Sequence, residues 1–240
     1  QKVIYLSPRW AKFMEEQLEF QPSYAMLTIS LAEGEQIKTE PGAMAAQMNV
    51  SMETASSGGF FKGLKKMALG GESFFLNTFT GGPGGGYVSL APPSPGDVAW
   101  FDVQPGRQLF IQSGSFLGCW SNVQTDTKFQ GMKGFFSGES LFFIRAFTED
   151  GNVGRVYYNA FGGIKPYSVQ AGQTLTVDTG HIVAFEDSLQ YNIGKTGGMK
   201  SFLFGGEGLV CNFSGQGTVW VQTRNLQGLA GLLAALLPPQ

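Results

Sequence analysis

Gly70-Gly71-Glu72-Ser73-Phe74-Phe75 is the stretch that decides the fold, because it returns twice further along the chain. Its later copies are Ser137-Gly138-Glu139-Ser140-Leu141-Phe142 and Gly205-Gly206-Glu207-Gly208-Leu209-Val210. A shorter element lies just upstream of each copy, as Gly63-Leu64-Lys65, Gly131-Met132-Lys133 and Gly198-Met199-Lys200. Both elements recur every 67 or 68 residues. Ordered landmarks at a constant spacing predict a tandem triplication of a unit of about 67 residues.

A second repeated element contains a turn. Its three copies are Glu40-Pro41-Gly42-Ala43-Met44, Gln112-Ser113-Gly114-Ser115-Phe116 and Asp178-Thr179-Gly180-His181-Ile182. The glycine in each copy lies between two strand-like runs, where a residue with positive φ closes a turn at little steric cost. The polar residue two positions earlier can bond the turn backbone, and Asp178 is the best suited of the three.

Period-2 patterning predicts β-strands around these turns. Leu27, Ile29 and Leu31 alternate with polar residues, and further alternating sets follow in Ala99/Phe101/Val103, Ile37/Thr39, Leu109/Ile111 and Leu175/Val177. The run after Glu139 is apolar at successive positions, which favours a strand covered on both faces. We therefore predict an all-β fold, with three repeats sharing one pseudo-threefold, sandwich-like or prism-like domain. Its limits are 24–225, divided at about 24–96, 97–162 and 163–225.

The two ends differ from the repeats. Residues 1–23 form an N-terminal extension, in which Ser7, Pro8 and the helically spaced Trp10, Phe13 and Met14 predict a short helix over 7–17. Residues 226–240 are an apolar tail, interrupted by glycine and stopped by Pro238-Pro239. We expect this tail to be a short helix that packs on its own sheet or on a neighbouring subunit, with contact to a membrane surface as the alternative.

Composition excludes several classes of protein. The chain of 240 residues has 35 Gly, a net charge of -2, one His and two Cys. The near-neutral charge gives no electrostatic footprint for nucleic acid, so no DNA partner is expected and RNA is disfavoured. One imidazole cannot supply a multi-histidine metal site, and no cofactor is predicted. Cys119 and Cys211 lie in apolar runs and are expected to be reduced and buried; no secretory signal is visible, so we expect a cytoplasmic protein.

The repeated motifs resemble the family named after altered inheritance of mitochondria protein 24. The resemblance spans roughly residues 24–225, and four motifs carry it in order: Gly34-Glu35 with Pro41-Gly42-Ala43-Met44, Gly70-Gly71-Glu72-Ser73, Val177 to Phe185, and Gly206 to Val210. It implies an uncharacterised bacterial member with a fold similar to the tryptophan RNA-binding attenuation protein and without a known catalytic centre. Eukaryotic members are associated with the organisation of the mitochondrial inner membrane. No transit-peptide-like start is visible here, so a mitochondrial location is not implied for this chain.

The repeats themselves provide one candidate site. About a pseudo-threefold axis, the repeated glutamates and lysines would converge into a polar ring that raises carboxylate pKa values or binds a cation. The six residues are Glu72, Glu139, Glu207, Lys65, Lys133 and Lys200. The favoured alternative is that each Glu begins a strand and pairs locally with the Lys of its own repeat, having been copied with the unit.

Three other features have simpler interpretations. His181 is expected to be a turn residue bonded to backbone, because no nucleophile motif accompanies it. The glycine-rich residues 81–86 lack a Gly-Lys-Ser/Thr ending and predict a flexible loop between two strands rather than a phosphate-binding loop. Residues 58–66 combine Phe60 and Phe61 with three lysines, and an exposed hairpin is favoured there over an RNA or lipid contact.

No catalytic constellation emerges, and no catalytic residue is assigned. The leading hypothesis is a non-enzymatic binding or scaffolding module that acts as a homo-oligomer through its exposed Phe-rich surface or its C-terminal tail. A protein or membrane-surface partner is possible besides a second copy. The alternatives are a small-ligand-binding regulator, similar in fold to the tryptophan-sensing protein, and a hydrolase or isomerase that uses the repeated carboxylates.

Overall fold

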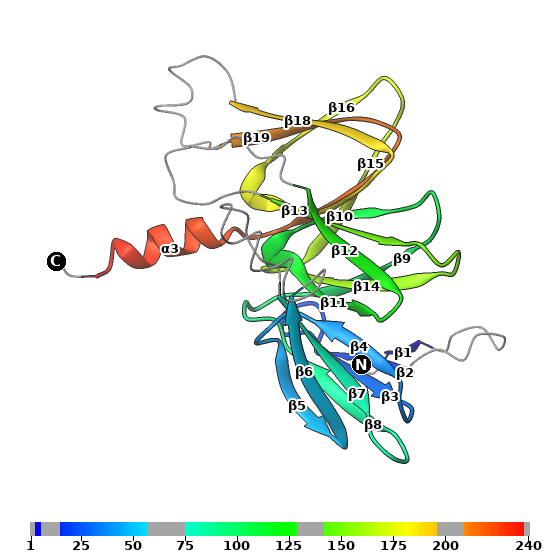
Figure 1. Cartoon of the computed structure of the whole chain (residues 1–240). Coiled ribbons are helices and arrows are strands. Elements are labelled where there is room, and N and C mark those ends of the chain that lie inside the picture. The colour runs from blue at the N-terminus through cyan, green and yellow to red at the C-terminus, as the bar shows by residue number, and fades with distance from the viewer. Residues whose placement is uncertain (1–2, 6–14, 57–74, 129–141, 196–208, 238–240) are drawn as a thin grey trace.

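The computed structural model describes residues 3–5, 15–56, 75–128, 142–195 and 209–237. Within these ranges the chain forms three successive groups of six strands, preceded by two strands and followed by one α-helix (Figure 1). The all-β fold class predicted from the sequence is confirmed. The groups are called the first, second and third segments.

The strands have the following bounds. The two leading strands are β1 (Val3–Tyr5) and β2 (Glu15–Glu19). The first segment comprises β3 (Met26–Leu31), β4 (Gln36–Thr39), β5 (Met44–Met48), β6 (Val50–Ser56), β7 (Phe75–Gly81) and β8 (Gly86–Leu90). The second comprises β9 (Val98–Val103), β10 (Leu109–Gln112), β11 (Phe116–Trp120), β12 (Val123–Lys128), β13 (Phe143–Thr148) and β14 (Gly154–Asn159). The third comprises β15 (Ile164–Val169), β16 (Thr174–Asp178), β17 (Ile182–Glu186), β18 (Leu189–Lys195), β19 (Leu209–Gly215) and β20 (Gly217–Gln222).

Strand pairing follows the same order in all three segments. The first, sixth and third strands are neighbours, in the triplets β3-β8-β5, β9-β14-β11 and β15-β20-β17. The second, fifth and fourth strands are neighbours, in the triplets β4-β7-β6, β10-β13-β12 and β16-β19-β18. All of these pairs are antiparallel. The tandem triplication and its domain limits stay a prediction, but the described strands are compatible with it.

Neighbouring segments are joined edge to edge. Strand β4 of the first segment pairs with β11 of the second, and β10 of the second pairs with β17 of the third. Sheets therefore run across the boundaries between segments, and the segments follow one another in space from β5 and β6 at one end to β16 and β18 at the other (Figure 1). Among the described strands, no third junction brings β16 back to β5.

The core follows the alternation that the sequence predicts. Leu27, Ile29 and Leu31 face inward from β3, whereas Met26, Thr28 and Ser30 are half-buried. One buried cluster extends over the first and second segments and reaches Val183 and Ala184 of the third. A second cluster lies mainly in the third segment around Phe185 and Phe213 and includes Phe143 of the second. The prediction of a strand covered on both faces is confirmed in β13, where Phe143 and Ile144 are both buried.

The prediction of a helix over residues 7–17 is wrong for residues 15–17, the part of this range that the structure describes. Glu15–Gln17 belong to β2, which pairs with β3 in the register Gln17↔Thr28; residues 6–14 lie outside the described residues. The reason is tertiary, because Glu16 and Leu18 alternate inward and bury their side chains. Pairing to β3 satisfies the backbone of this stretch and overrides its local helical pattern.

The three predicted turns divide into two kinds. Gly42 has the positive φ (88°) expected for it. The same expectation is wrong for Gly114 and Gly180, which lie in the 3-10 turns Ser113–Ser115 and Thr179–His181. The predicted capping is confirmed at Asp178, whose carboxylate accepts a hydrogen bond from the Gly180 N–H at 2.9 Å.

The C-terminal tail forms helix α3 (Leu226–Ala234), capped by the Asn225 side chain. It projects away from the sheets (Figure 1), and all of its residues are exposed. The predicted helix is therefore confirmed, whereas packing of the tail on its own sheet is wrong. The described part of the chain contains no helix long and apolar enough to cross a membrane.

Candidate functional site

The predicted polar ring cannot be placed. Glu72, Glu139, Glu207, Lys65, Lys133 and Lys200 all lie outside the described residues, as does the Phe- and Lys-rich stretch 58–66. Their convergence and their local pairing both stay predictions. The described residues direct attention to other surfaces.

Strand β5 is exposed along its whole length, unlike the equivalent strands of the other two segments. All five of its residues, Met44–Met48, are exposed, with Met48 at 59%. In the other segments the third strands are buried: all five residues of β11, and the first four of β17. Trp120, which corresponds to Met48 when the turn glycines are aligned, is only 8% exposed. Strands β11 and β17 each also pair with a strand of the preceding segment, whereas β5 pairs only with β8 among the described strands.

The backbone of β5 nevertheless has the shape of its buried counterparts. Its register with β8 shifts between Met44 and Ala46. The same irregularity occurs between Phe116 and Gly118 in β11, and between Ile182 and Ala184 in β17. A β-bulge at the same aligned position bends each strand in the same way. Strand β5 is therefore built like a joining strand, although no described strand pairs with its outer edge.

Strand β16 is the complementary open edge at the other end of the molecule. Its counterparts β4 and β10 each pair on both sides, whereas β16 pairs only with β19 among the described strands. Leu175 is half-buried where Ile37 and Leu109 are fully buried. The edge thus leaves apolar side-chain surface and one row of backbone groups without a described neighbour.

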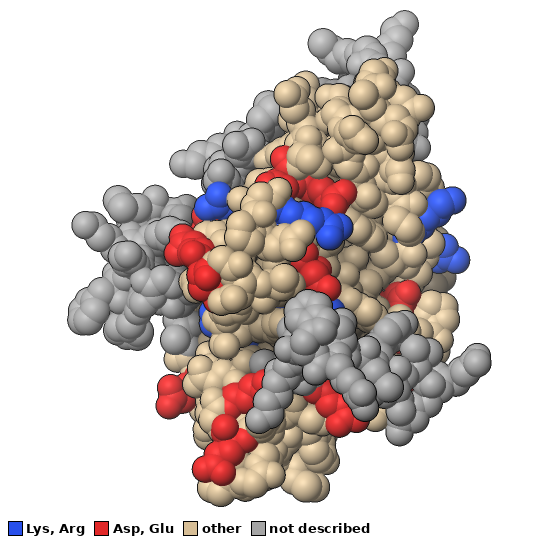
Figure 2. All heavy atoms as spheres, turned by 90° about the vertical axis from the view of Figure 1, so that its right-hand side faces the viewer, with Lys and Arg blue, Asp and Glu red and all other residues tan. Residues whose placement is uncertain are grey.

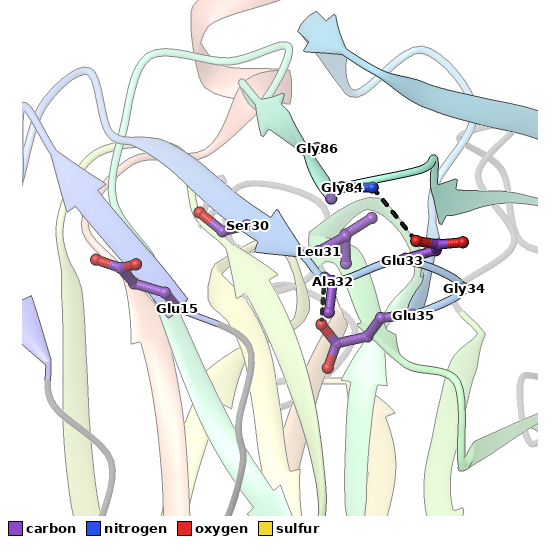
Figure 3. A pocket seen from close by; sticks show the side chains of 10 residues that line it. Glu15, Ser30, Leu31, Ala32, Glu33, Gly34, Glu35, Gly84 and Gly86 are labelled. Carbon is purple, nitrogen blue, oxygen red and sulfur yellow. Dashed lines mark hydrogen bonds between the residues drawn. The ribbon is translucent and has the colours of Figure 1, made fainter.

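An open depression of about 580 Å³ lies beside the β7–β8 connection. Glu15, Glu33 and Glu35 line it together with backbone of Gly84, Gly85 and Gly86 (Figure 3). The carboxylate of Glu33 accepts from the Gly84 N–H (3.3 Å), and that of Glu35 accepts from the Ala32 N–H (2.8 Å), so both are engaged in holding loops. The predicted loop between two strands is confirmed, and the surrounding carboxylates disfavour an anion there.

A buried polar network fixes strand β2 to the second segment. Glu16 is 5% exposed, and its Oε2 accepts from Arg155 Nη1 at 2.7 Å. Its other oxygen accepts from the Tyr157 hydroxyl, which in turn accepts from Trp120 Nε1 at 2.9 Å. Burial raises the pKa of Tyr157 well above its ordinary value, and the nearby Glu16 carboxylate adds to the effect. A tyrosine that stays protonated and donates in this way is a structural group rather than an acid–base catalyst.

The single histidine and the two cysteines also have structural settings. His181 lies in the 3-10 turn before β17, where Nδ1 hydrogen-bonds with the Gln222 carbonyl at 2.8 Å, as predicted. Cys119 and Cys211 are buried free thiols, which confirms the prediction for both. Burial raises the pKa of each thiol to about 12, so neither is a thiolate near neutral pH. Within the described ranges, no three His, Cys, Asp or Glu side chains are grouped to hold a metal ion.

Charge is distributed without a basic patch on the face that Figure 2 shows. Among its described residues, Lys and Arg side chains are scattered and mixed with acidic ones, and the end that holds the first segment displays acidic side chains alone. Arg155 illustrates the mixing, because its guanidinium bonds both Glu16 and Asp102.

Sequence reasoning missed the open edges of the sheets. The sequence pattern predicted self-association through a Phe-rich surface or through the tail, whereas the edge strands β5 and β16 are rich in Met, Ala and Thr. One signal was available in the sequence: Met44-Ala45-Ala46-Gln47-Met48 contains no charged residue and no proline, although an exposed edge strand normally has one or the other. The pattern alone does not reveal which strands meet between segments.

These observations define an all-β protein of consecutive six-stranded segments joined edge to edge, in which β5 and β16 each have one edge that pairs with no other described strand. A family model described as mitochondrial biogenesis AIM24 matches residues 17–224. Because the match covers most of the chain, the chain belongs to that family, as the repeated motifs indicated.

Relatives in Streptococcus pyogenes are similar over nearly the whole chain. An uncharacterized protein of S. pyogenes serotype M6 is 31% identical over 224 residues, covering 90% of this chain and 88% of its own. The crystal structure of another S. pyogenes protein superposes with a TM-score of 0.77 at 26% identity, covering 94% of this chain and all of that one. The chain is therefore an AIM24-family protein with bacterial relatives, one of which is described as uncharacterized.

Proposed function

We propose that this chain is a non-enzymatic scaffolding or binding module that acts as a homo-oligomer. One observation carries the proposal: β5 is exposed on every residue, although it has the bulge of strands that are buried in the other two segments. An apolar edge strand without charge or proline is prone to pair with another chain. In a folded, functional protein, such an edge is best explained as an interface that is completed by association.

The non-enzymatic part of the proposal rests on the settings of the reactive groups. The cysteine thiols are buried, the imidazole is bonded to a backbone carbonyl, and the carboxylate of Glu16 is tied to Arg155 and Tyr157. Among the described residues, none of these groups forms a nucleophile–base pair. The acidic depression in Figure 3 is an open hollow lined by carboxylates and loop backbone, whereas a site for a small ligand normally encloses most of the ligand's surface.

Helix α3 supports the binding part of the proposal. Leu226, Leu229, Leu232 and Leu233 are exposed on it, and Leu236 and Leu237 follow at 81% and 69% exposure. A contiguous apolar surface of this kind marks a contact with a protein or membrane surface. The scaffold would then assemble through its sheet edges and present α3 to a partner.

The mass of the protein in solution tests the proposal. Light scattering after size exclusion is expected to give a multiple of 25.8 kDa for the full chain, and the same multiple for a chain that ends at Asn225. Loss of the oligomer on removing residues 226–240 would show that the chains associate through α3 rather than through the sheet edges. A monomeric full chain at all concentrations would refute the homo-oligomer.

A further inference from the structure

The two junctions inside the molecule share one register. In the first, Thr39 is opposite Gly118, and Ile37 is opposite Trp120. In the second, Ile111 is opposite Ala184, and Leu109 is opposite Glu186. When Gly42, Gly114 and Gly180 are aligned, these two sets of pairs coincide position by position. The junction is therefore a repeated, geometrically defined interaction rather than two unrelated contacts.

Continuing the series by one step uses the two open edges. In the third segment, the strand equivalent to β4 and β10 is β16. In the first segment, the strand equivalent to β11 and β17 is β5. They lie at opposite ends of the molecule (Figure 1), so one copy does not pair its own β16 with its own β5. The next partner for β16 is the β5 of a second copy.

We infer that β5 of one copy pairs antiparallel with β16 of a second copy, in the register Ala46↔Val177, Gln47↔Thr176 and Met48↔Leu175. The inference rests on the proposed self-association and names its partner and geometry. It would give the exposed strand β5 the same pairing that its buried counterparts β11 and β17 have.

Side-chain size at the junction supports this register. Gly118 faces β4 so closely that a Cβ there would lie 2.8 Å from the Lys38 carbonyl oxygen. The corresponding residue at the second junction is Ala184, and in β5 it is Ala46, so all three strands have a small residue at this position. On the apolar face, Met48 would cover Leu175, which is only half-buried in the isolated chain.

The other edge strands of the sheets are less suited than β5 and β16 to pair with a second copy. The remaining edge strands are β1, β6, β9, β12, β15 and β18. Strand β1 has only three residues, and a very short edge strand offers little to pair with. Strand β15 contains Lys165 and Pro166, which oppose pairing with a further strand. Strands β6, β9, β12 and β18 each contain a charged residue. The only charge on β16 is Asp178, and its carboxylate already caps the following turn.

The geometry makes the association head to tail. Each copy contributes β5 to one neighbour and β16 to another, so the interface is heterologous. Each added copy again presents one free β5 and one free β16. The assembly therefore grows until it closes as a ring, or it continues as a filament.

Disulfide cross-linking tests the register. Gln47→Cys and Thr176→Cys place two thiols directly opposite each other, at exposed positions that a single chain tolerates. The native thiols of Cys119 and Cys211 are buried and do not interfere. Under mild oxidation, the double variant is expected to link most chains into covalent multimers, which are resolved on a non-reducing gel.

Three matched controls sharpen the result. Gln47→Cys alone and Thr176→Cys alone are expected not to cross-link, because β5 does not meet β5 and β16 does not meet β16. Gln47→Cys with Thr174→Cys moves the second thiol two residues along the same face of β16, too far for a disulfide, and its yield is expected to fall at least about tenfold. Circular dichroism checks that every variant remains folded.

The outcomes separate this inference from the proposed function. Cross-linking of the Gln47/Thr176 pair without the Gln47/Thr174 pair supports the β5–β16 interface. An oligomer in which neither pair cross-links, or in which both do equally, overturns the register while the self-association stands. A chain that remains monomeric overturns both.

Discussion

Glu40→Gln is expected to stabilise the protein at neutral and alkaline pH and to leave its stability unchanged near pH 4. Glu40 directly follows β4, and its N–H donates to the Leu117 carbonyl of the neighbouring segment at 3.0 Å. Its Oε2 is buried without a hydrogen-bond partner among the described residues. At the aligned positions, Gln112 and Asp178 accept hydrogen bonds from Gly114 and Gly180. Glu40 has no such bond, and burial raises its pKa from 4.5 to about 7.

The sign of the pH dependence follows from proton binding. With the pKa raised in the folded state, the native protein binds more protons than the unfolded chain between pH 4.5 and about 7. Its stability therefore falls as the pH rises through that window. At about 1.4 kcal/mol per pKa unit, the full shift corresponds to an upper limit of about 3 kcal/mol. Because Glu40 is only partly buried, solvent screening reduces this to roughly 1–2 kcal/mol.

Urea denaturation at pH 4, 6 and 8 measures the effect. The free energy of unfolding of Glu40→Gln is expected to match that of the wild type at pH 4 and to exceed it by roughly 1–2 kcal/mol at pH 8. Protein concentrations must be equal, because association also contributes to stability. Glu53→Gln, on exposed β6, controls for the change in net charge. A difference between wild type and Glu40→Gln that is the same at pH 4 and pH 8 would refute the reasoning.

Three further predictions concern side chains with structural settings. Glu16→Ala is expected to lower the free energy of unfolding by about 3 kcal/mol, since it leaves the buried Tyr157 hydroxyl and Arg155 without their shared acceptor. Glu15 is exposed on the same strand, and Glu15→Ala is expected to change the free energy of unfolding by less than about 0.5 kcal/mol. Asp178→Ala is expected to cost about 1 kcal/mol by removing the acceptor for the Gly180 N–H, and an unchanged thermal midpoint would contradict this. Cys119 and Cys211 are expected to react with a thiol reagent at pH 8 only as fast as the protein unfolds; rapid labelling of either thiol in the folded protein would show that it is accessible.

Local patterns predicted the parts of the fold that depend on local chemistry. The alternation of Leu27, Ile29 and Leu31 gave the inward face of β3, and Asp178 gave a turn cap. Both follow from the period of a strand or from a hydrogen bond that spans two residues. The apolar tail likewise predicted α3, although not its projection away from the sheets.

Features that depend on distant partners were not predictable in this way. The stretch before Leu18 has a helical pattern, yet Glu15–Gln17 are in a strand because β3 and Arg155 lie beside them. Gly114 and Gly180 occupy the same aligned position as Gly42, yet only Gly42 has a positive φ, because the other two turns tighten into 3-10 turns. The run Met44–Met48 has neither charge nor proline and indicates a strand suited to pairing, but the exposure of β5 depends on which strands meet between segments, and the local pattern does not show that. The repeated Glu and Lys residues remain a prediction, since they lie outside the described residues.

The central claim is that copies of this chain join through β5, and one comparison of masses tests it most directly. Ala46→Asp with Met48→Asp places two carboxylates on the face that would cover Val177 and Leu175, where burial of an unpaired charge opposes pairing. Both residues are exposed in the single chain, so the fold is expected to tolerate the change. Light scattering is expected to give a multiple of 25.8 kDa for the wild type and 25.8 kDa for the double variant. An equal mass for the two proteins, whether monomeric or oligomeric, would contradict it.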